Sequence, residues 1–200
     1  MAVTAERAAT TTRRAEVGRA AARLFSQRGY HGTSMQHLGD ALGLQRGSLY
    51  AHIGSKEELL FDVVAEGADR FLTAAHKADG LEATARARLT ALLVGHIETA
   101  ATHHEAATVF LSEWRYLSED LRAPIQNKRD EYEAIVRRII ADGIAGGEFR
   151  PDADVFFAAT LVLSAGNWTY TWYRPGGRLT PAEIGTRFAQ LVINGLTEED

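Results

Sequence analysis

Cysteine is absent from this 200-residue chain, which excludes a disulfide framework and any thiolate metal site. Proline is scarce, and its four residues all lie beyond residue 120. No stretch approaches the ~18 consecutive apolar residues of a membrane span, and residues 1–12 lack the apolar core of a signal peptide. We therefore expect a cytoplasmic protein that has no membrane partner.

Enzyme motifs are lacking as well. The sequence contains no Walker loop, no GxGxxG, no HExxH and no GxSxG. Ser48 has no paired base in reach by sequence, and His96 and His104 are not spaced i, i+4 with a carboxylate to complete a metal site. We predict no catalytic residue, no metal and no cofactor.

Charge is distributed unevenly along the chain. Residues 1–56 carry a formal net charge of +5, whereas the rest of the chain carries −9. A basic head on an acidic body is expected when only one end of a protein meets phosphate. A chance fluctuation is the alternative explanation.

Apolar residues recur with helical period along the whole chain, which predicts an all-α fold. In the first quarter they mark three short helices: residues 13–27, a helix through Leu42 that Thr33 or Ser34 caps, and residues 45–50. Gly29, Gly43 and Gly54 are the expected ends of these three helices.

Capping boxes mark further helix starts, at Ser55–Glu58 and at Thr180–Glu183, where Pro181 takes the first helical position. A long helix follows the first of them, over residues 55–78. The remaining helices are expected over about 81–102, 104–117, 118–145, from an Asp152 cap to Trp172, and over 181–196.

The segment from Thr33 to His52 combines two short helices with a glycine-containing turn, which is the spacing of a helix-turn-helix. Such a motif lays its second helix in the major groove of DNA, where Arg forks onto guanine and Gln pairs with adenine. Helix pairs with a glycine turn also occur in structural bundles. The outward residues of the second helix are Gln45, Arg46, Gly47, Ser48 and Tyr50, and the phosphate candidates are Thr33, Tyr50, His52 and Lys56.

Residues 21–64, AARLFSQRGYHGTSMQHLGDALGLQRGSLYAHIGSKEELLFDVV, resemble the DNA-binding domain of the TetR family of repressors. The matching features are LF and Gly29, Thr33-Ser34, the ALG turn, GSLY, His52 and SKEEL. Gln45 departs from the family, in which Ser is commoner, and so does Gly39, which should weaken its helix slightly because Ala is usual there. The resemblance implies DNA contacts from Thr33, Ser34, Gln45, Arg46, Gly47, Ser48, Tyr50, His52 and Lys56.

The second half resembles a narrower group. RYLSEDLRAPIQNKRDEYEAIV (115–136) and NWTYTWYRPGGRLTPAEIG (167–185) are similar to TetR-type regulators of fatty-acid and sterol catabolism, several of which release DNA on binding an acyl-CoA thioester. Some members carry an Arg where this chain has Thr171. The aromatic candidates also suit a core or a dimer interface, and the arginines also suit solvent. The expected ligand-binding residues are Phe110, Arg115, Arg129, Tyr132, Asn167, Trp168 and Arg174.

The predicted organisation is a disordered arm over residues 1–12, a helix-turn-helix domain over 13–54, and a ligand-binding and dimerisation domain over 55–200, with the helix over 55–78 as the linker. The last two long helices carry more apolar surface than one body needs, which predicts a C2 homodimer. Its expected interface residues are Phe156, Leu161, Leu163, Phe188, Leu191 and Val192.

The predicted function is that of a transcriptional regulator, a repressor that binds a pseudo-palindromic DNA operator. A small effector, such as an acyl-CoA, would release it from the operator by favouring a state in which the two DNA-binding domains of the dimer are wrongly spaced. An enzyme on a helical scaffold and a helical protein-interaction adaptor are the alternatives.

Overall fold

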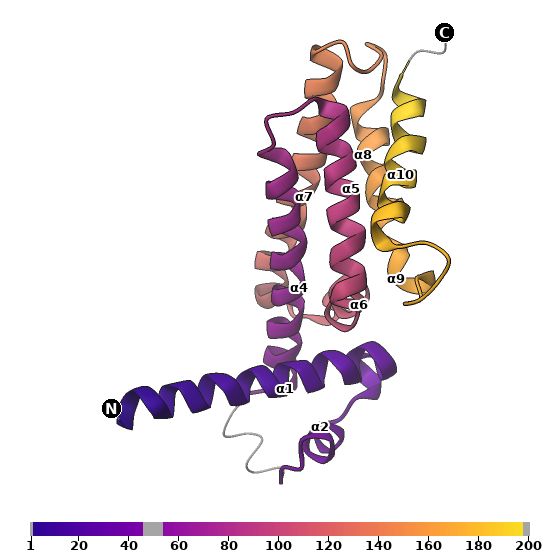
Figure 1. The fold of residues 1–200 in the computed structure, drawn as a ribbon. Coiled ribbons are helices and arrows are strands. Elements are labelled where there is room, and N and C mark those ends of the chain that lie inside the picture. The colour runs from indigo at the N-terminus through magenta and orange to yellow at the C-terminus, as the bar shows by residue number, and fades with distance from the viewer. Residues whose placement is uncertain (1, 46–53, 198–200) are drawn as a thin grey trace. The chain divides into compact units, whose positions relative to one another are not determined.

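The computed structural model describes residues 2–45 and 54–197, together with the side chains of residues 13–45 and 54–197. Helices are the only regular elements in these ranges, which confirms the all-α fold class (Figure 1). The chain forms two compact units: unit 1 comprises Met1–Gly67 and Glu105–Ile125, and unit 2 comprises Ala68–His104 and Gln126–Asp200. These units do not follow the boundary after residue 54, because residues 105–125 pack with the N-terminal segment.

Unit 1 begins with α1 (Ala2–Gly32), whose bounds include most of the segment expected to be a disordered arm. That segment contains neither proline nor glycine, the two residues that oppose a helix most strongly. The unit also contains α2 (Met35–Leu42), the first part of α4 (Lys56–Asp79), α6 (His104–Ser112), the short 3-10 helix η1 (Trp114–Tyr116) and the start of α7 (Glu119–Ala145).

Two of the three glycines predicted to end helices, Gly29 and Gly43, do so within the described residues. Gly29 has φ 72° and ψ 163°, which interrupts α1 one turn before its end. Gly43 closes α2 in the left-handed conformation, with φ 64° and ψ 30°. Residues with a Cβ rarely adopt such angles. Ser55 Oγ accepts a hydrogen bond of 3.0 Å from Glu58 N, which confirms the predicted cap of α4.

The core of unit 1 is built from the apolar stripes that predicted its helices. Val17 and Phe25 of α1, Leu38 of α2 and Leu60 of α4 are at most 1% exposed. Burying side chains of this size removes apolar surface from water, which is the main favourable contribution to folding. The stripes therefore fix how α1, α2 and α4 face their common core.

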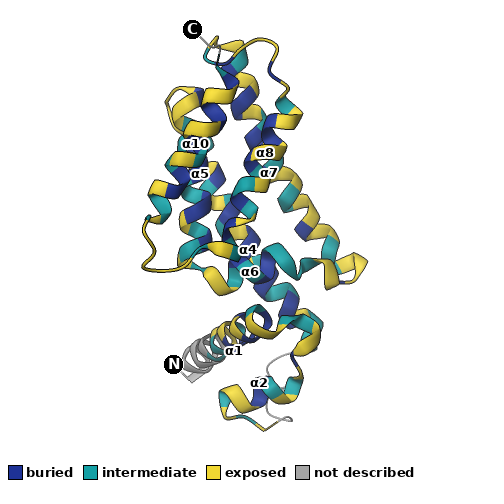
Figure 2. Ribbon diagram, turned by 90° about the vertical axis from the view of Figure 1, so that its right-hand side faces the viewer, coloured by how far each residue is buried: buried dark blue, intermediate teal, exposed yellow. Residues whose placement is uncertain are grey.

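Unit 2 contains α5 (Ala85–Thr102), α8 (Val155–Asn167), α9 (Thr169–Trp172) and α10 (Pro181–Leu196), with the later parts of α4 and α7. Helices α5 and α10 run side by side (Figure 1). Gly185 permits their close approach, since a Cβ at this position would lie 2.5 Å from Val94 Cα. Figure 2 shows buried positions alternating with exposed ones along both helices, as expected when one face of each is in the core.

Two helix starts in unit 2 test the sequence prediction. Thr180 and Glu183 form the predicted reciprocal capping box, with Pro181 as the first residue of α10. The predicted Asp152 cap of α8 is wrong, because Asp154 takes this role and accepts a hydrogen bond of 3.0 Å from Phe157 N. The predicted single helix to Trp172 is also divided into α8 and α9.

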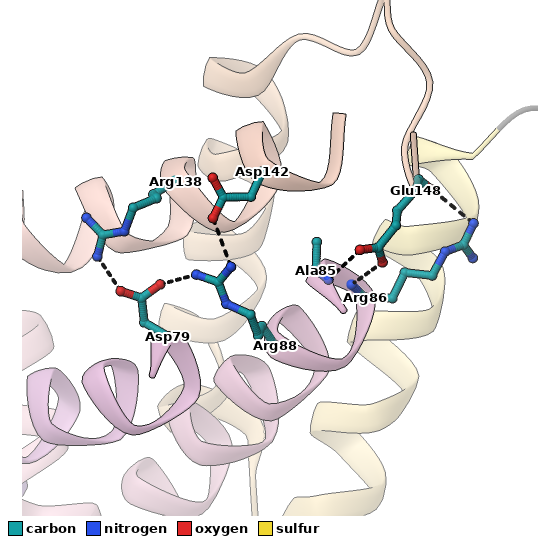
Figure 3. Close-up of polar contacts among 7 residues, drawn as sticks. All are labelled: Asp79, Ala85, Arg86, Arg88, Arg138, Asp142 and Glu148. Atoms are coloured by element: carbon teal, nitrogen blue, oxygen red, sulfur yellow. Dashed lines mark hydrogen bonds and ion pairs between the residues drawn. The ribbon is translucent and has the colours of Figure 1, made fainter. Parts of the chain in front are cut away.

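A polar network joins α4, α5 and α7 at one end of unit 2 (Figure 3). Asp79 accepts hydrogen bonds from Arg88 and Arg138, and Arg88 also donates to Asp142 at 2.8 Å. Glu148 lies beyond α7 and accepts hydrogen bonds from the backbone N–H groups of Ala85, at 2.8 Å, and Arg86, at 3.1 Å. A carboxylate at this position satisfies amide groups that the start of α5 leaves unpaired.

Candidate functional site

The turn before α2 uses both hydroxyl side chains that the sequence assigns to DNA contacts. Thr33 is 1% exposed, and its Oγ1 donates to the carbonyl oxygens of Gly29, at 2.9 Å, and Leu24, at 3.2 Å. A phosphate contact by the Thr33 side chain is therefore not supported, since its hydroxyl holds the turn together. Ser34 is exposed and is the N-cap of α2.

The cap of α2 is reciprocal. Ser34 Oγ accepts a hydrogen bond from His37 N, and His37 Nδ1 accepts one from Ser34 N, both at 3.2 Å. The sequence offered either Thr33 or Ser34 as the cap, without a reciprocal partner, because capping boxes ordinarily have Glu or Gln where this chain has His37.

In the sequence, the predicted recognition helix follows the turn at Gly43. Gln45 is exposed directly after this turn. Gly39 lies beneath it: a Cβ there would lie 2.9 Å from the Leu44 carbonyl oxygen, so the glycine lets Leu44 approach α2. The other predicted base and phosphate contacts, Arg46, Gly47, Ser48, Tyr50 and His52, lie outside the described residues, and their role stays a prediction.

Lys56 is the first residue of α4, as predicted, and is half-buried. Its Nζ lies 4.1 Å from the ring centroid of Tyr30, within the range of a cation–π contact. Burial lowers the pKa of Lys56. Burial also raises the pKa of Tyr30, and the charge of Glu57 adds to that effect. The lysine is thus held in the first turn of α4, and the N-terminus of a helix itself attracts anions.

Residues 113–118 bind the end of α1 and the start of α4 within unit 1, a relationship that no local sequence pattern signals. Glu113 Oε2 accepts a hydrogen bond of 2.6 Å from Tyr30 N, and the Tyr116 ring stacks on Tyr30 with centroids 6.2 Å apart. Glu57 Oε1 accepts a hydrogen bond of 2.6 Å from Ser118 N, which lowers the pKa of Glu57.

The predicted ligand-binding residues divide between the two units. Phe110 is buried in unit 1, where a Cβ on Gly67 would lie 2.7 Å from Phe110 Cβ. Arg115 is exposed in the same unit and donates to the Ser112 carbonyl oxygen at 2.9 Å. The remaining candidates are Arg129, Tyr132, Asn167, Trp168 and Arg174 of unit 2.

Within unit 2, only some of these candidates face the helical core. Tyr132 is buried, and its Oη lies 2.9 Å from His96 Nδ1. Arg129 is half-buried; burial lowers its pKa, and the charges of Asp130 and Glu133 oppose this effect. Trp168, by contrast, is 64% exposed, so in this structure it does not line a tunnel through the core. Asn167 is half-buried at the end of α8, and Arg174 is exposed and donates to the Tyr173 carbonyl oxygen at 2.8 Å.

A groove of about 400 Å³ lies along α4 and α5 of unit 2. None of the predicted ligand-binding residues lines it. Small residues such as Ala74, Ala78 and Gly95 form part of its wall, and Lys77, Glu98 and His103 supply polar groups. No sequence pattern signals this groove, because small residues on two separate helices are indistinguishable from ordinary helix positions.

The predicted dimer face is largely exposed in the single chain. Phe156, Leu161 and Leu191 are 59%, 51% and 71% exposed. Leu163 and Phe188 are half-buried. Val192 is 6% exposed and packs into the core of its own unit, so it is not available as an interface residue. Further large apolar side chains that are exposed on α8, α9 and the residues between them are Phe157, Trp168 and Trp172.

Among the side chains of residues 13–45 and 54–197, no group of three His, Asp or Glu could hold a metal ion. Within residues 2–45 and 54–197, no helix is both long and apolar enough to cross a membrane.

Comparison with known proteins decides the family. The family model described as "Bacterial regulatory proteins, tetR family" matches residues 19–63, and the one described as "Tetracyclin repressor-like, C-terminal domain" matches residues 82–196. The HTH-type transcriptional repressor KstR2 of Mycobacterium tuberculosis is 31% identical over 191 residues, which is 94% of each chain. This chain belongs to the TetR family.

Solved structures of TetR-family regulators share the fold. The structure of the ketosteroid transcriptional regulator KstR2 of Mycobacterium tuberculosis covers 94% of this chain and 96% of its own, with 29% identity and a TM-score of 0.87. AibR, solved in complex with isovaleryl coenzyme A and operator DNA, covers 90% of this chain and 97% of its own, with 29% identity and a TM-score of 0.82.

The ranges that match the two family models contain the main structural features described above. The N-terminal match includes the Gly29 interruption, α2 and the first residues of α4. The C-terminal match includes α5, α8 and α10 and the His96–Tyr132 pair. The resemblance inferred from the sequence motifs is therefore confirmed in both halves.

Proposed function

We propose that this TetR-family protein is a homodimeric repressor that binds operator DNA through residues 33–56 and is released by a coenzyme A thioester. The observation that carries the proposal is the similarity to AibR, which spans nearly all of both chains and was solved with both a thioester and DNA. The matches to both TetR family models support the same assignment, with DNA binding in the N-terminal part of the chain and effector binding in the C-terminal part.

DNA binding is supported by the charge and by the ends of the helices. The net charge of +5 on residues 1–56 attracts phosphate, and the N-terminus of α4, which begins with Lys56, attracts anions as well. Gln45 is exposed directly after the turn, where base-reading residues of a helix-turn-helix begin.

Dimerisation is supported by the exposed apolar side chains of α8 and α10. Phe156, Leu161 and Leu191 are each more than half exposed, although side chains of this kind normally lie in a core. A two-fold axis beside α8 and α10 would bury them against their own copies, as in a four-helix bundle. A dimer also supplies the two recognition helices that a pseudo-palindromic operator needs.

The DNA test uses the full chain and a library of random duplexes. Repeated selection at low salt should enrich an inverted repeat whose half-sites are about one helical turn apart. If no sequence is enriched but duplexes of mixed sequence bind, the recognition proposal is wrong. If no duplex binds even at low salt, the helical adaptor is the better description.

The effector test measures thermal unfolding with coenzyme A thioesters of increasing chain length, with free coenzyme A and with the matching free acids. A ligand at ~100 times its dissociation constant adds about 2.7 kcal/mol to stability, which raises the midpoint by a few degrees for a chain of this size. We expect a rise with thioesters of one chain type only. The same thioester should release the selected operator, and a thioester that stabilises the protein without releasing DNA would contradict the regulatory proposal.

A further inference from the structure

His96 is a polar side chain inside the apolar core of unit 2. It lies on α5 and is 4% exposed. Its ring contacts Phe71 of α4, with centroids 4.6 Å apart, and Tyr132 of α7, with centroids 5.7 Å apart. Gly166 of α8 lies beside it, since a Cβ on this glycine would be 3.0 Å from His96 Nε2. Four helices thus enclose one imidazole.

The hydrogen bond to Tyr132 defines which ring nitrogen of His96 carries the proton. Burial lowers the pKa of His96 to about 4, and a hydrogen bond to the Gly166 backbone partly offsets this effect, so the ring is neutral at pH 7 and has one N–H group. Tyr132 Oη lies 2.9 Å from Nδ1. If Nδ1 accepts from the phenol, the phenol proton is satisfied and the ring proton is on Nε2. The opposite tautomer would leave the phenol proton without an acceptor.

Nε2 is then a buried donor whose neighbouring acceptor, the Gly166 backbone, is poorly placed for it. Within the described residues no acceptor meets hydrogen-bond geometry with it, and the backbone of Gly166 lies close by. Buried polar groups in native proteins are nearly always paired, and an exception calls for a function or a bound group. The glycine contributes here, because any larger residue on α8 would cover this edge of the ring.

We propose that His96 Nε2–H is the donor that recognises the carbonyl oxygen of the effector, and that Tyr132 is a positioning residue that fixes the tautomer of His96. The inference rests on the proposed effector function of unit 2. It also specifies which atom of the effector the protein recognises: a neutral oxygen that accepts a hydrogen bond, as in a thioester or a ketone. A carboxylate is disfavoured, because one neutral donor among apolar side chains does not compensate for the desolvation of a charge.

The enclosure of His96 also gives the effector a means of acting on the protein. A carbonyl can reach Nε2 only when the groups packed around it, including the Gly166 backbone of α8, move apart, so a ligand that makes this bond binds an opened arrangement of unit 2 better than the closed one. Differential affinity of this kind is what a ligand needs to shift a conformational equilibrium.

The test compares a thioester with its thioether, which lacks only the carbonyl oxygen. Isovaleryl-CoA and S-isopentyl-CoA form one such pair, and the same pairing applies to whichever thioester binds best. We expect the wild-type protein to bind the thioester about tenfold more tightly by calorimetry, the size of one buried hydrogen bond. His96→Phe should reduce this ratio to about one, and Tyr132→Phe should reduce it in part. His76→Gln, which alters an exposed histidine of α4, should leave it unchanged.

A second measurement uses the wild-type protein alone, so it does not depend on whether a variant folds. In the wild-type protein, ¹⁵N NMR of the imidazoles should show one ring that stays neutral between pH 5 and 8 with its proton on Nε2. That proton signal should move downfield with the thioester and not with the thioether. An unchanged thioester preference in His96→Phe, or a proton on Nδ1, would overturn the proposal while leaving the effector function standing. Failure of every thioester to bind the wild-type protein would overturn both.

Discussion

The backbone N–H of Tyr30 donates a hydrogen bond of 2.6 Å to the carboxylate of Glu113, 83 residues further along the chain. Tyr30 directly follows Gly29, whose angles interrupt α1. An interrupted helix leaves amide groups without their usual acceptors, and Glu113 supplies one from α6–η1. The direction in which the chain leaves α1 toward α2 therefore depends on a distant residue.

Glu113→Ala should lower the free energy of unfolding by about 1.5–3 kcal/mol, the range for a hydrogen bond to a charged group. Glu113→Gln should lose less, because its carbonyl oxygen still accepts. Urea denaturation measures both, with Glu98→Ala on the exposed side of α5 as the control. Equal stability of Glu113→Ala and the control would show that the bond contributes nothing.

Gly39→Ala should destabilise the protein, contrary to the usual gain of replacing a helical glycine. The new Cβ would lie 2.9 Å from the Leu44 carbonyl oxygen, so the turn after α2 must shift. Gly18→Ala is the matched control in α1: its Cβ would meet no atom within 4 Å, and it should stabilise by about 0.5–1 kcal/mol. Chemical denaturation measures the free energy of unfolding of both variants. A gain in stability for Gly39→Ala would refute the close approach of Leu44.

Asp79 should make stability depend on pH at the acidic end. Burial raises its pKa, but hydrogen bonds from Arg138 and Arg88 outweigh burial, so the native pKa is lowered. The stabilisation is therefore fully present above the unfolded pKa of about 4 and is lost as pH falls through the lower native value. Asp79→Asn should be less stable than wild type at pH 7, with a smaller difference at pH 3. Asp152→Asn, at an exposed site, should show neither effect.

Leu161→Asp and Leu191→Asp should convert a dimer into a chain of 21.9 kDa, as measured by light scattering on a sizing column. Both side chains are more than half exposed, so the charges should cost the core little and should oppose only an interface. Leu81→Asp, at another exposed leucine, is the control and should stay dimeric. A dimer that survives both interface substitutions would place the interface elsewhere.

Arg46→Ala should reduce discrimination at one base pair of the selected operator by about 1–3 kcal/mol, whereas Lys56→Ala should weaken all sequences alike and lower the salt slope by about 1. Lys77→Ala, in unit 2, should change neither quantity. Fluorescence anisotropy at several salt concentrations separates the two effects. Unchanged base preference in Arg46→Ala would show that the recognition helix is assigned wrongly.

Local chemistry explains why much of the fold is predictable from the sequence. Gly29 and Gly43 end helices because of their own backbone angles, and Thr180 with Glu183 begins one through contacts three residues apart. Each of these signals lies within one helical turn. Asp152 fails as a cap because Asp154 has the same chemistry two residues later, and a sequence pattern does not choose between them.

The site is less predictable because its contacts are distant in sequence. Nothing near Glu113 indicates that its partner is the Tyr30 amide, and nothing near His96 indicates Tyr132. A helical stripe also does not separate core from interface: Leu191 and Val192 are adjacent on α10, yet one is 71% exposed and the other 6%. Such distinctions arise only when the other helices are in place.

Unit 1 is built from two separate segments of the chain, which affects how operator specificity can be exchanged between relatives. A chimera that takes only residues 1–54 from another TetR-family protein would pair a foreign α1 end with the Glu113 and Tyr116 of this chain. The transferable module is therefore discontinuous, and it includes residues 105–125 as well as the N-terminal segment. Chimeras joined at residue 54 should bind their operator poorly unless the recipient carries an acid and an aromatic residue at the positions of Glu113 and Tyr116.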